Sequence, residues 1–132
     1  MTNAKTASRV NLSFIRLELA RTPEFPQGSP DHAYEFVAPL TKDSHIDAAA
    51  WKDARDRCEV TRIWGSAPLQ TGRLRHVGTG WRFDYDARDD SDDEPFFKLD
   101  KHALGPGAYV SITEQDGVQR PFKVVSVTPL GK

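Results

Sequence analysis

Cysteine and long apolar runs are scarce in this sequence, and each scarcity removes a class of protein. The 132 residues include one cysteine, Cys58, so no disulfide can form within the chain and the fold needs no oxidising compartment. The apolar runs are short, for example residues 48–51, and fall far below the roughly 18 residues that a membrane-spanning helix needs. No apolar segment follows the basic residues Lys5 and Arg9, so no signal peptide is expected. We therefore expect a cytoplasmic protein without membrane contact.

An excess of one charge sign is also missing. Lys and Arg together number 18 and Asp and Glu number 19, which gives a net charge of -1. Proteins that bind nucleic acids or membrane surfaces usually carry a clear basic excess, so neither partner is expected. The length suits one domain, and an aromatic content of 10% is too high for a wholly disordered chain. We expect a disordered lead-in over residues 1–10 and a single globular β-rich domain over residues 11–130.

Alternation of apolar and polar residues predicts β-strands through most of the chain. In residues 13–19, Ile15, Leu17 and Leu19 fall on one face, which is the pattern of a strand with one buried side. Residues 21–31 contain three prolines and a glycine and predict a long loop. Further strands are expected over residues 33–40, 58–64, 73–77, 81–85, 96–99, 109–113 and 119–127.

Two hairpins can be placed in register. A two-residue Gly78-Thr79 turn, with glycine first, keeps apolar and polar side chains on opposite faces, whereas a one-residue slip would mix them. A three-residue loop, Gln115-Asp116-Gly117, is expected to join the last two strands. The expected pairs are His76 with Trp81, Leu74 with Phe83, Arg75 with Arg82, Arg73 with Asp84, Val110 with Phe122, and Ala108 with Val124.

One helix is expected, over residues 45–57. Ser44 suits the N-cap position, and Asp47 three residues later completes a capping box. With about seven or eight strands and one helix, the predicted fold class is mainly β (α+β). We expect an antiparallel twisted sheet or small β-barrel, with the helix near residues 45–57 at one end.

Two parts of the chain carry a resemblance to known proteins. Residues 102–112 (His-Ala-Leu-Gly-Pro-Gly-Ala-Tyr-Val-Ser-Ile), with Asp116-Gly117 and residues 121–127 (Pro-Phe-Lys-Val-Val-Ser-Val), resemble the C-terminal half of small bacterial proteins of unknown function. Residues 81–86 (Trp-Arg-Phe-Asp-Tyr-Asp), followed by an acidic turn and Glu94-Pro95, are similar to the same proteins. The resemblance covers most of the chain from Phe14 onward. It implies a bacterial family and carries no catalytic residue.

The most prominent charge feature is the acidic segment, residues 84–94. Closely spaced carboxylates can bind Ca²⁺, but Arg88, Asp89 and Pro95 occupy positions where an EF-hand loop needs other residues. The alternatives are a solvated loop between two strands, an acidic contact surface for a basic partner, or a looser calcium site. The candidate binding residues are Asp84, Asp86, Asp89, Asp90, Asp92, Asp93 and Glu94.

Motifs for catalysis and cofactors are missing from the sequence. There is no H-x-x-H, C-x-x-C, G-x-S-x-G or phosphate-binding glycine loop, so no metal and no cofactor is expected. The weak catalytic candidates are His76, which lies beside Trp81 in the expected hairpin, and the Asp100-x-His102 pair, whose carboxylate could orient the imidazole. An ordinary core or loop histidine is the competing interpretation for each.

The hairpin over residues 73–85 admits two interpretations, nucleic-acid binding and a purely structural role. Arg73, Arg75 and Arg82 share one face, but the expected register puts Trp81 and Phe83 on the other, where they belong to the core. We predict a non-enzymatic binding or interaction module that uses the acidic segment and takes a protein or small-molecule partner. It would be a monomer, or a homodimer formed through a strand edge. The alternatives are a small enzyme using His76 and His102, or a protein that binds Ca²⁺ at the acidic segment.

Overall fold

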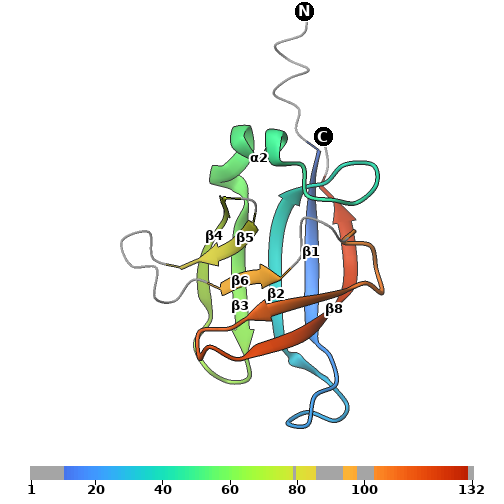
Figure 1. Ribbon diagram of the computed structural model, residues 1–132, viewed down its shortest axis with the longest axis vertical. Coiled ribbons are helices and arrows are strands. Elements are labelled where there is room, and N and C mark those ends of the chain that lie inside the picture. The colour runs from blue at the N-terminus through green and yellow to red at the C-terminus, as the bar shows by residue number, and fades with distance from the viewer. Residues whose placement is uncertain (1–10, 79, 86–93, 98–102, 131–132) are drawn as a thin grey trace, which may run out of the picture.

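Eight antiparallel strands and one short helix make up the described part of the protein (Figure 1). The computed structural model describes residues 11–78, 80–85, 94–97 and 103–130, with the backbone alone for 94–97. The helix α2, Ala48–Ala54, runs directly into the 3₁₀ turn η1, Arg55–Arg57. The strands are β1 Leu12–Leu19, β2 Ser29–Pro39, β3 Glu59–Trp64, β4 Gln70–Val77, β5 Gly80–Asp84, β6 Glu94–Phe97, β7 Tyr109–Thr113 and β8 Gln119–Pro129.

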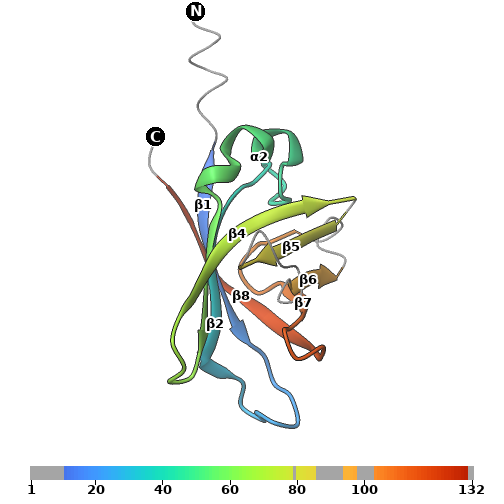
Figure 2. The ribbon, with the colours of Figure 1, turned by 90° about the vertical axis from the view of Figure 1, so that its left-hand side faces the viewer.

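The strands are joined in chain order into a curled sheet that closes on itself. Each strand pairs with the next, and β8 pairs back with β1, so the order is a barrel of β1 to β8. The long strands β1, β2, β4 and β8 form most of the wall, whereas β6 joins its neighbours over only a few residues (Figure 2). The helix α2 lies at one end of the barrel. The predicted fold class, a mainly β antiparallel twisted sheet or small β-barrel with one helix, is confirmed.

The interior of the barrel is filled by side chains. In β1, Ile15, Leu17 and Leu19 are buried and alternate with half-buried residues, as their sequence pattern predicts. The largest fully buried side chains include Tyr34, Phe36, Phe83 and Phe122, which come from β2, β5 and β8 and are in ring contact. In the described residues the barrel centre is therefore a packed core, and a ligand site has to lie elsewhere.

Both predicted hairpin registers are confirmed. The β4–β5 pairs are those expected from the sequence, and Trp81 and Phe83 are buried on the interior face. Gly78 has φ +63°, while Thr79 lies outside the described residues. In the C-terminal hairpin Val110 pairs with Phe122, the Val124 N–H donates to the Ala108 carbonyl, and the loop glycine, Gly117, has φ +82°.

The start of the helix was predicted wrongly. The N-cap is Asp47, whose carboxylate accepts from the Ala50 N–H, and the helix runs only to Ala54 before tightening into η1. Ser44 instead sits in a turn with φ +68° and accepts from the Leu104 N–H through its carbonyl. A bridge between Leu40 and Ile46 holds residues 41–45 as a loop, so the helix cannot begin at Ser44. Within the described residues, no helix has the length and apolar character needed to cross a membrane.

Candidate functional site

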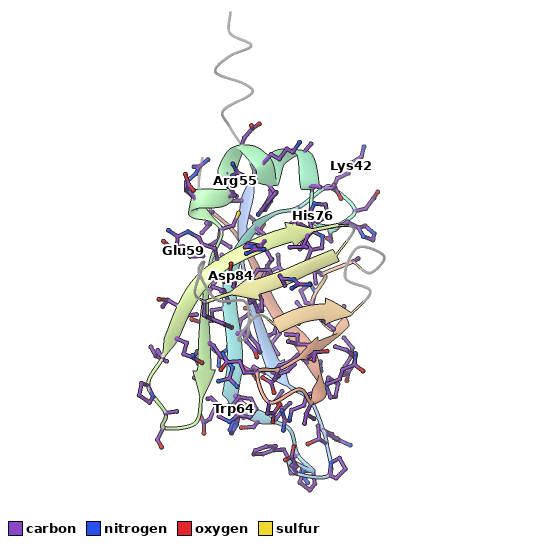
Figure 3. All side chains as sticks on the ribbon, turned by 60° about the vertical axis from the view of Figure 1, so that its left-hand side comes forward. Lys42, Arg55, Glu59, Trp64, His76 and Asp84 are labelled. Carbon is purple, nitrogen blue, oxygen red and sulfur yellow. The ribbon has the colours of Figure 1, made fainter. Side chains whose placement is uncertain are left out.

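A cavity of about 490 Å³ lies between α2 with η1, together called the helical segment (residues 48–57), β4 and the end of β5. Figure 3 shows Arg55 and His76 near the helical end of the barrel, with Asp84 below them, while Trp64 is at the opposite end. The volume falls within the range of small-molecule sites, roughly 300–1,000 Å³. We call this the helix-side cavity. It is lined by Trp51, Arg55, Asp56, Thr71, Gly72, Arg73, Leu74, Arg75, His76, Asp84 and Tyr85.

The cavity forms where β4 runs past the end of its partner strand. Pairing between β3 and β4 ends at Glu59 opposite Arg73, and from there the helical segment takes the place of β3. The Leu74 N–H donates to the Cys58 carbonyl at 2.8 Å. The indole N–H of Trp51 donates to the Leu74 carbonyl at 3.0 Å. These two bonds fix the helical segment against β4 and leave the space beside it open.

Gly72 allows the end of β5 to approach β4 closely at the wall of this cavity. A Cβ at position 72 would lie 2.3 Å from the Asp84 carbonyl oxygen and 2.9 Å from the Tyr85 Cα. Both atoms belong to the backbone, so neither can swing aside. Sequence reasoning missed this residue. The expected strand begins at residue 73, so Gly72 lies outside it, whereas β4 begins at Gln70 and contains this glycine. A lone glycine inside a strand often marks a close backbone approach, and this signal becomes visible only with the longer strand.

The rings of Trp51 and His76 form the floor of the cavity at the helical end, and Trp81 packs against both of them. The His76 ring stacks on Trp81, with centroids 4.2 Å apart and planes 23° apart. Trp51 meets the same two rings edge-on, at 5.9 Å from His76 and 5.5 Å from Trp81. His76 is thus fixed by two tryptophans while it lines the cavity. Of the sequence-predicted catalytic candidates, His76 alone lies in the described residues, because Asp100 and His102 are outside them.

Three arginines bring positive charge to the cavity, and they differ in how far it is neutralised. Arg75 pairs with the buried Asp84 carboxylate at 2.5 Å. Arg73 lies 3.7 Å from Glu59, and both side chains are more than half exposed, so solvent screens this pair. Arg55 lies 5.9 Å above the Trp51 ring, and no carboxylate of the described residues pairs with it. Arg55 comes from η1, and the other two arginines come from β4. The sequence does not indicate that these two elements lie side by side.

The acidic segment is only partly described. Asp84 is buried, and its carboxylate accepts a hydrogen bond from Arg75, which links β5 to β4. Glu94 begins β6, where its backbone pairs with Phe83. The remaining predicted binding residues, Asp86, Asp89, Asp90, Asp92 and Asp93, lie outside the described residues. Binding of a partner or of Ca²⁺ by this segment stays a prediction.

An ion-pair cluster occupies the end of the barrel away from the helix. Glu114 is fully buried as a side chain and accepts from the Tyr34 hydroxyl at 2.5 Å and from Arg120 at 2.9 Å. Arg120 also binds Asp116, which lowers the pKa of that carboxyl, and the guanidinium lies over the Trp64 ring. The buried Glu114 carboxylate has its hydrogen-bond and ion-pair partners within the cluster. We therefore infer that the cluster stabilises the fold and is not a binding site.

Neither the cysteine nor a metal site supplies a reactive centre in the described residues. Burial raises the pKa of the Cys58 thiol to about 11, and its S–H donates to the Ala54 carbonyl, which is the opposite of what a nucleophile needs. Among the described residues, no group of three or more His, Cys, Asp and Glu side chains is arranged to hold a metal ion.

Comparison with known proteins adds no assignment. No protein-family model matches this sequence, and searches of curated proteins and of solved structures found no significant match. The resemblance to small bacterial proteins therefore stays a prediction.

Proposed function

We propose that this protein is a small-molecule-binding barrel whose ligand occupies the helix-side cavity. The observation that carries the proposal is the cavity itself, about 490 Å³ in volume and lined by aromatic, hydroxyl and guanidinium groups together. Binding sites for small molecules combine apolar walls with a few polar groups that orient the ligand. The proposal keeps the binding function predicted from the sequence and moves it from the acidic segment to the cavity.

The rigidity of the walls supports this proposal. Trp51 is held by its hydrogen bond to the Leu74 carbonyl, the His76 ring contacts two tryptophans, and Gly72 lies against backbone atoms. A site whose walls are fixed before binding loses less conformational entropy when the ligand arrives. The walls also come from both β4 and the helical segment, so the cavity depends on the complete fold.

The packed interior argues for the same location. The side chains in the barrel centre, among them Phe36, Phe83 and Phe122, are almost completely buried. A second hollow of about 530 Å³ lies against the β1–β2 loop, where it is lined by Tyr109, Lys123 and Val125 among others. That hollow has no buried aromatic floor, since Tyr109 is 59% exposed. The helix-side cavity is therefore the better candidate.

The test is a screen of small organic acids, amines and neutral molecules, read by amide chemical shifts of the labelled full-length protein. Molecules that bind are expected to shift the amides of Gly72, Leu74 and His76 around the cavity. The amides of Gly28 and Tyr109, beside the second hollow, serve as the internal control. The proposal is wrong if no molecule binds, or if the shifts gather around Gly28 and Tyr109 instead.

A further inference from the structure

We propose that the ligand of the helix-side cavity is an organic anion, in which one oxyanion group, carboxylate or phosphate, is attached to a flat apolar body. This inference rests on the proposed function and names the class of its ligand. It is carried by the Arg55 guanidinium, which no carboxylate of the described residues pairs with, and by the apolar surface beside it.

The charge balance of the lining favours an anion. The lining residues contain three arginines, Arg55, Arg73 and Arg75, and two carboxylates, Asp56 and Asp84, so the excess is one positive charge. Asp84 is already bonded to Arg75, which removes that pair from the balance. What is left in the lining is Arg55 and Arg73 against Asp56, while Glu59, which faces Arg73 at 3.7 Å, is exposed and lies outside the lining. The charge of Arg73 is therefore partly met by an exposed and screened pair, and Arg55 is the lining cation that no carboxylate of the described residues pairs with.

Arg55 is the group best prepared to receive the anion. No carboxylate in the described residues pairs with its guanidinium, which lies 5.9 Å above the Trp51 ring. An arginine fork can donate two parallel hydrogen bonds to a carboxylate or phosphate. Arg73, whose contact with Glu59 is 3.7 Å long and exposed, can turn toward the same anion at little loss.

The surface beside the arginines suits a flat apolar body. Trp51, Leu74 and Tyr85 line the cavity, and the indole N–H of Trp51 is already used by the Leu74 carbonyl. Trp51 therefore offers the ligand an apolar ring rather than a donor. A hydrophilic anion without such a body would leave this wall in contact with water, so inorganic phosphate is expected to bind more weakly than its aromatic ester.

The test compares four probes on the full-length protein by isothermal titration: benzoate, phenyl phosphate, inorganic phosphate and uncharged benzamide. We expect benzoate or phenyl phosphate to bind about tenfold or more tightly than benzamide and inorganic phosphate. The stronger of the two identifies the oxyanion as carboxylate or phosphate. Raising the salt from about 0.05 to 0.5 M should weaken the anion and leave benzamide unchanged.

Arg57 provides the matched control, since it belongs to the same 3₁₀ turn as Arg55, is exposed and does not line the cavity. We expect Arg55→Ala to weaken the bound anion about five- to tenfold and Arg57→Ala to weaken it less than twofold. Equal losses in the two variants would overturn the inference. If benzamide binds at the cavity as tightly as benzoate, the ligand class is wrong and the proposed function stands. If none of the probes and none of the screened molecules binds, both are wrong.

Discussion

Replacing Gly72 by alanine tests the geometry on which the cavity depends. The added Cβ would lie 2.3 Å from the Asp84 carbonyl oxygen, 2.9 Å from the Asp84 carbonyl carbon and 2.9 Å from the Tyr85 Cα. Ordinary van der Waals contact begins at 3.4 Å, so the two strands must move apart by about 1 Å or distort. All three atoms are backbone, and relief by a side-chain rotation is not available.

The size of the effect follows from two opposing terms. Overpacking of this kind destabilises a protein by about 1–3 kcal/mol, and three backbone contacts place it at the upper end of that range. Alanine lowers the conformational entropy of the unfolded chain relative to glycine, and this stabilises the folded state by about 0.4–1 kcal/mol. We expect a net loss of about 2 kcal/mol in the free energy of unfolding. For a domain of this size, that loss lowers Tm by about 6 °C.

The assay is urea and thermal unfolding followed by tryptophan fluorescence and circular dichroism. Gly105→Ala is the matched control, because no atom lies within 4 Å of the Cβ that it would add. That variant should be as stable as the original protein or more stable by up to about 1 kcal/mol. If Gly72→Ala proves as stable as the control, β5 does not approach β4 as described. The described geometry of this wall of the helix-side cavity would then be wrong.

Three further predictions concern stability and reactivity. Cys58 should resist thiol reagents at pH 8 in the native protein and react once urea unfolds it, because burial raises its pKa to about 11; modification of the native thiol would contradict this. Tyr34→Phe removes a donor to the buried Glu114 and should lower the free energy of unfolding by about 1–3 kcal/mol in urea titrations, and an unchanged midpoint would refute it. The Arg120 ion pair lowers the pKa of Asp116, so this carboxylate stabilises the fold above about pH 4 and loses that effect as the pH falls through its lower folded-state value. The stability gap between the original protein and Asp116→Asn should therefore shrink on acidification, and a constant gap would rule out the linkage.

The strands and their registers could be predicted because the information is local. In the β4–β5 hairpin, alternate side chains of each strand face the core, so one choice of register decides which do. The expected register places Leu74, Trp81 and Phe83 on the core side, where they are found. The helix start could not be predicted in the same way. Ser44 and Asp47 both suit an N-cap, and the bridge from Leu40 to Ile46 decides between them.

The candidate site depends on contacts between parts of the chain far apart in sequence. His76 was singled out beside Trp81, and the structure places it in the cavity. The sequence predicts Arg73 and Arg75 on the outer face of the hairpin, and in the structure Arg75 pairs with Asp84. That prediction does not include Arg55. Nothing in the pattern around Arg55 shows that its turn takes the place of β3 beside β4. Only the three-dimensional path of the helical segment brings the two together.

The pairing of β1 with β8 has a consequence for how the chain reaches this fold. It joins strands from opposite ends of the described sequence, with Ser13 opposite Pro129, whereas every other pair of the described strands joins neighbours in the chain. Closing so long a loop is entropically the most demanding step, and barrels with such contacts fold slowly. The same adjacency means that a short linker from the end of β8 to the start of β1, with the chain opened at the β3–β4 turn, would remove the β3–β4 connection, add one between β8 and β1, and keep all the others. Such a rearranged chain would turn the closing pair into a local hairpin and shift the slow step to the place where the chain was cut.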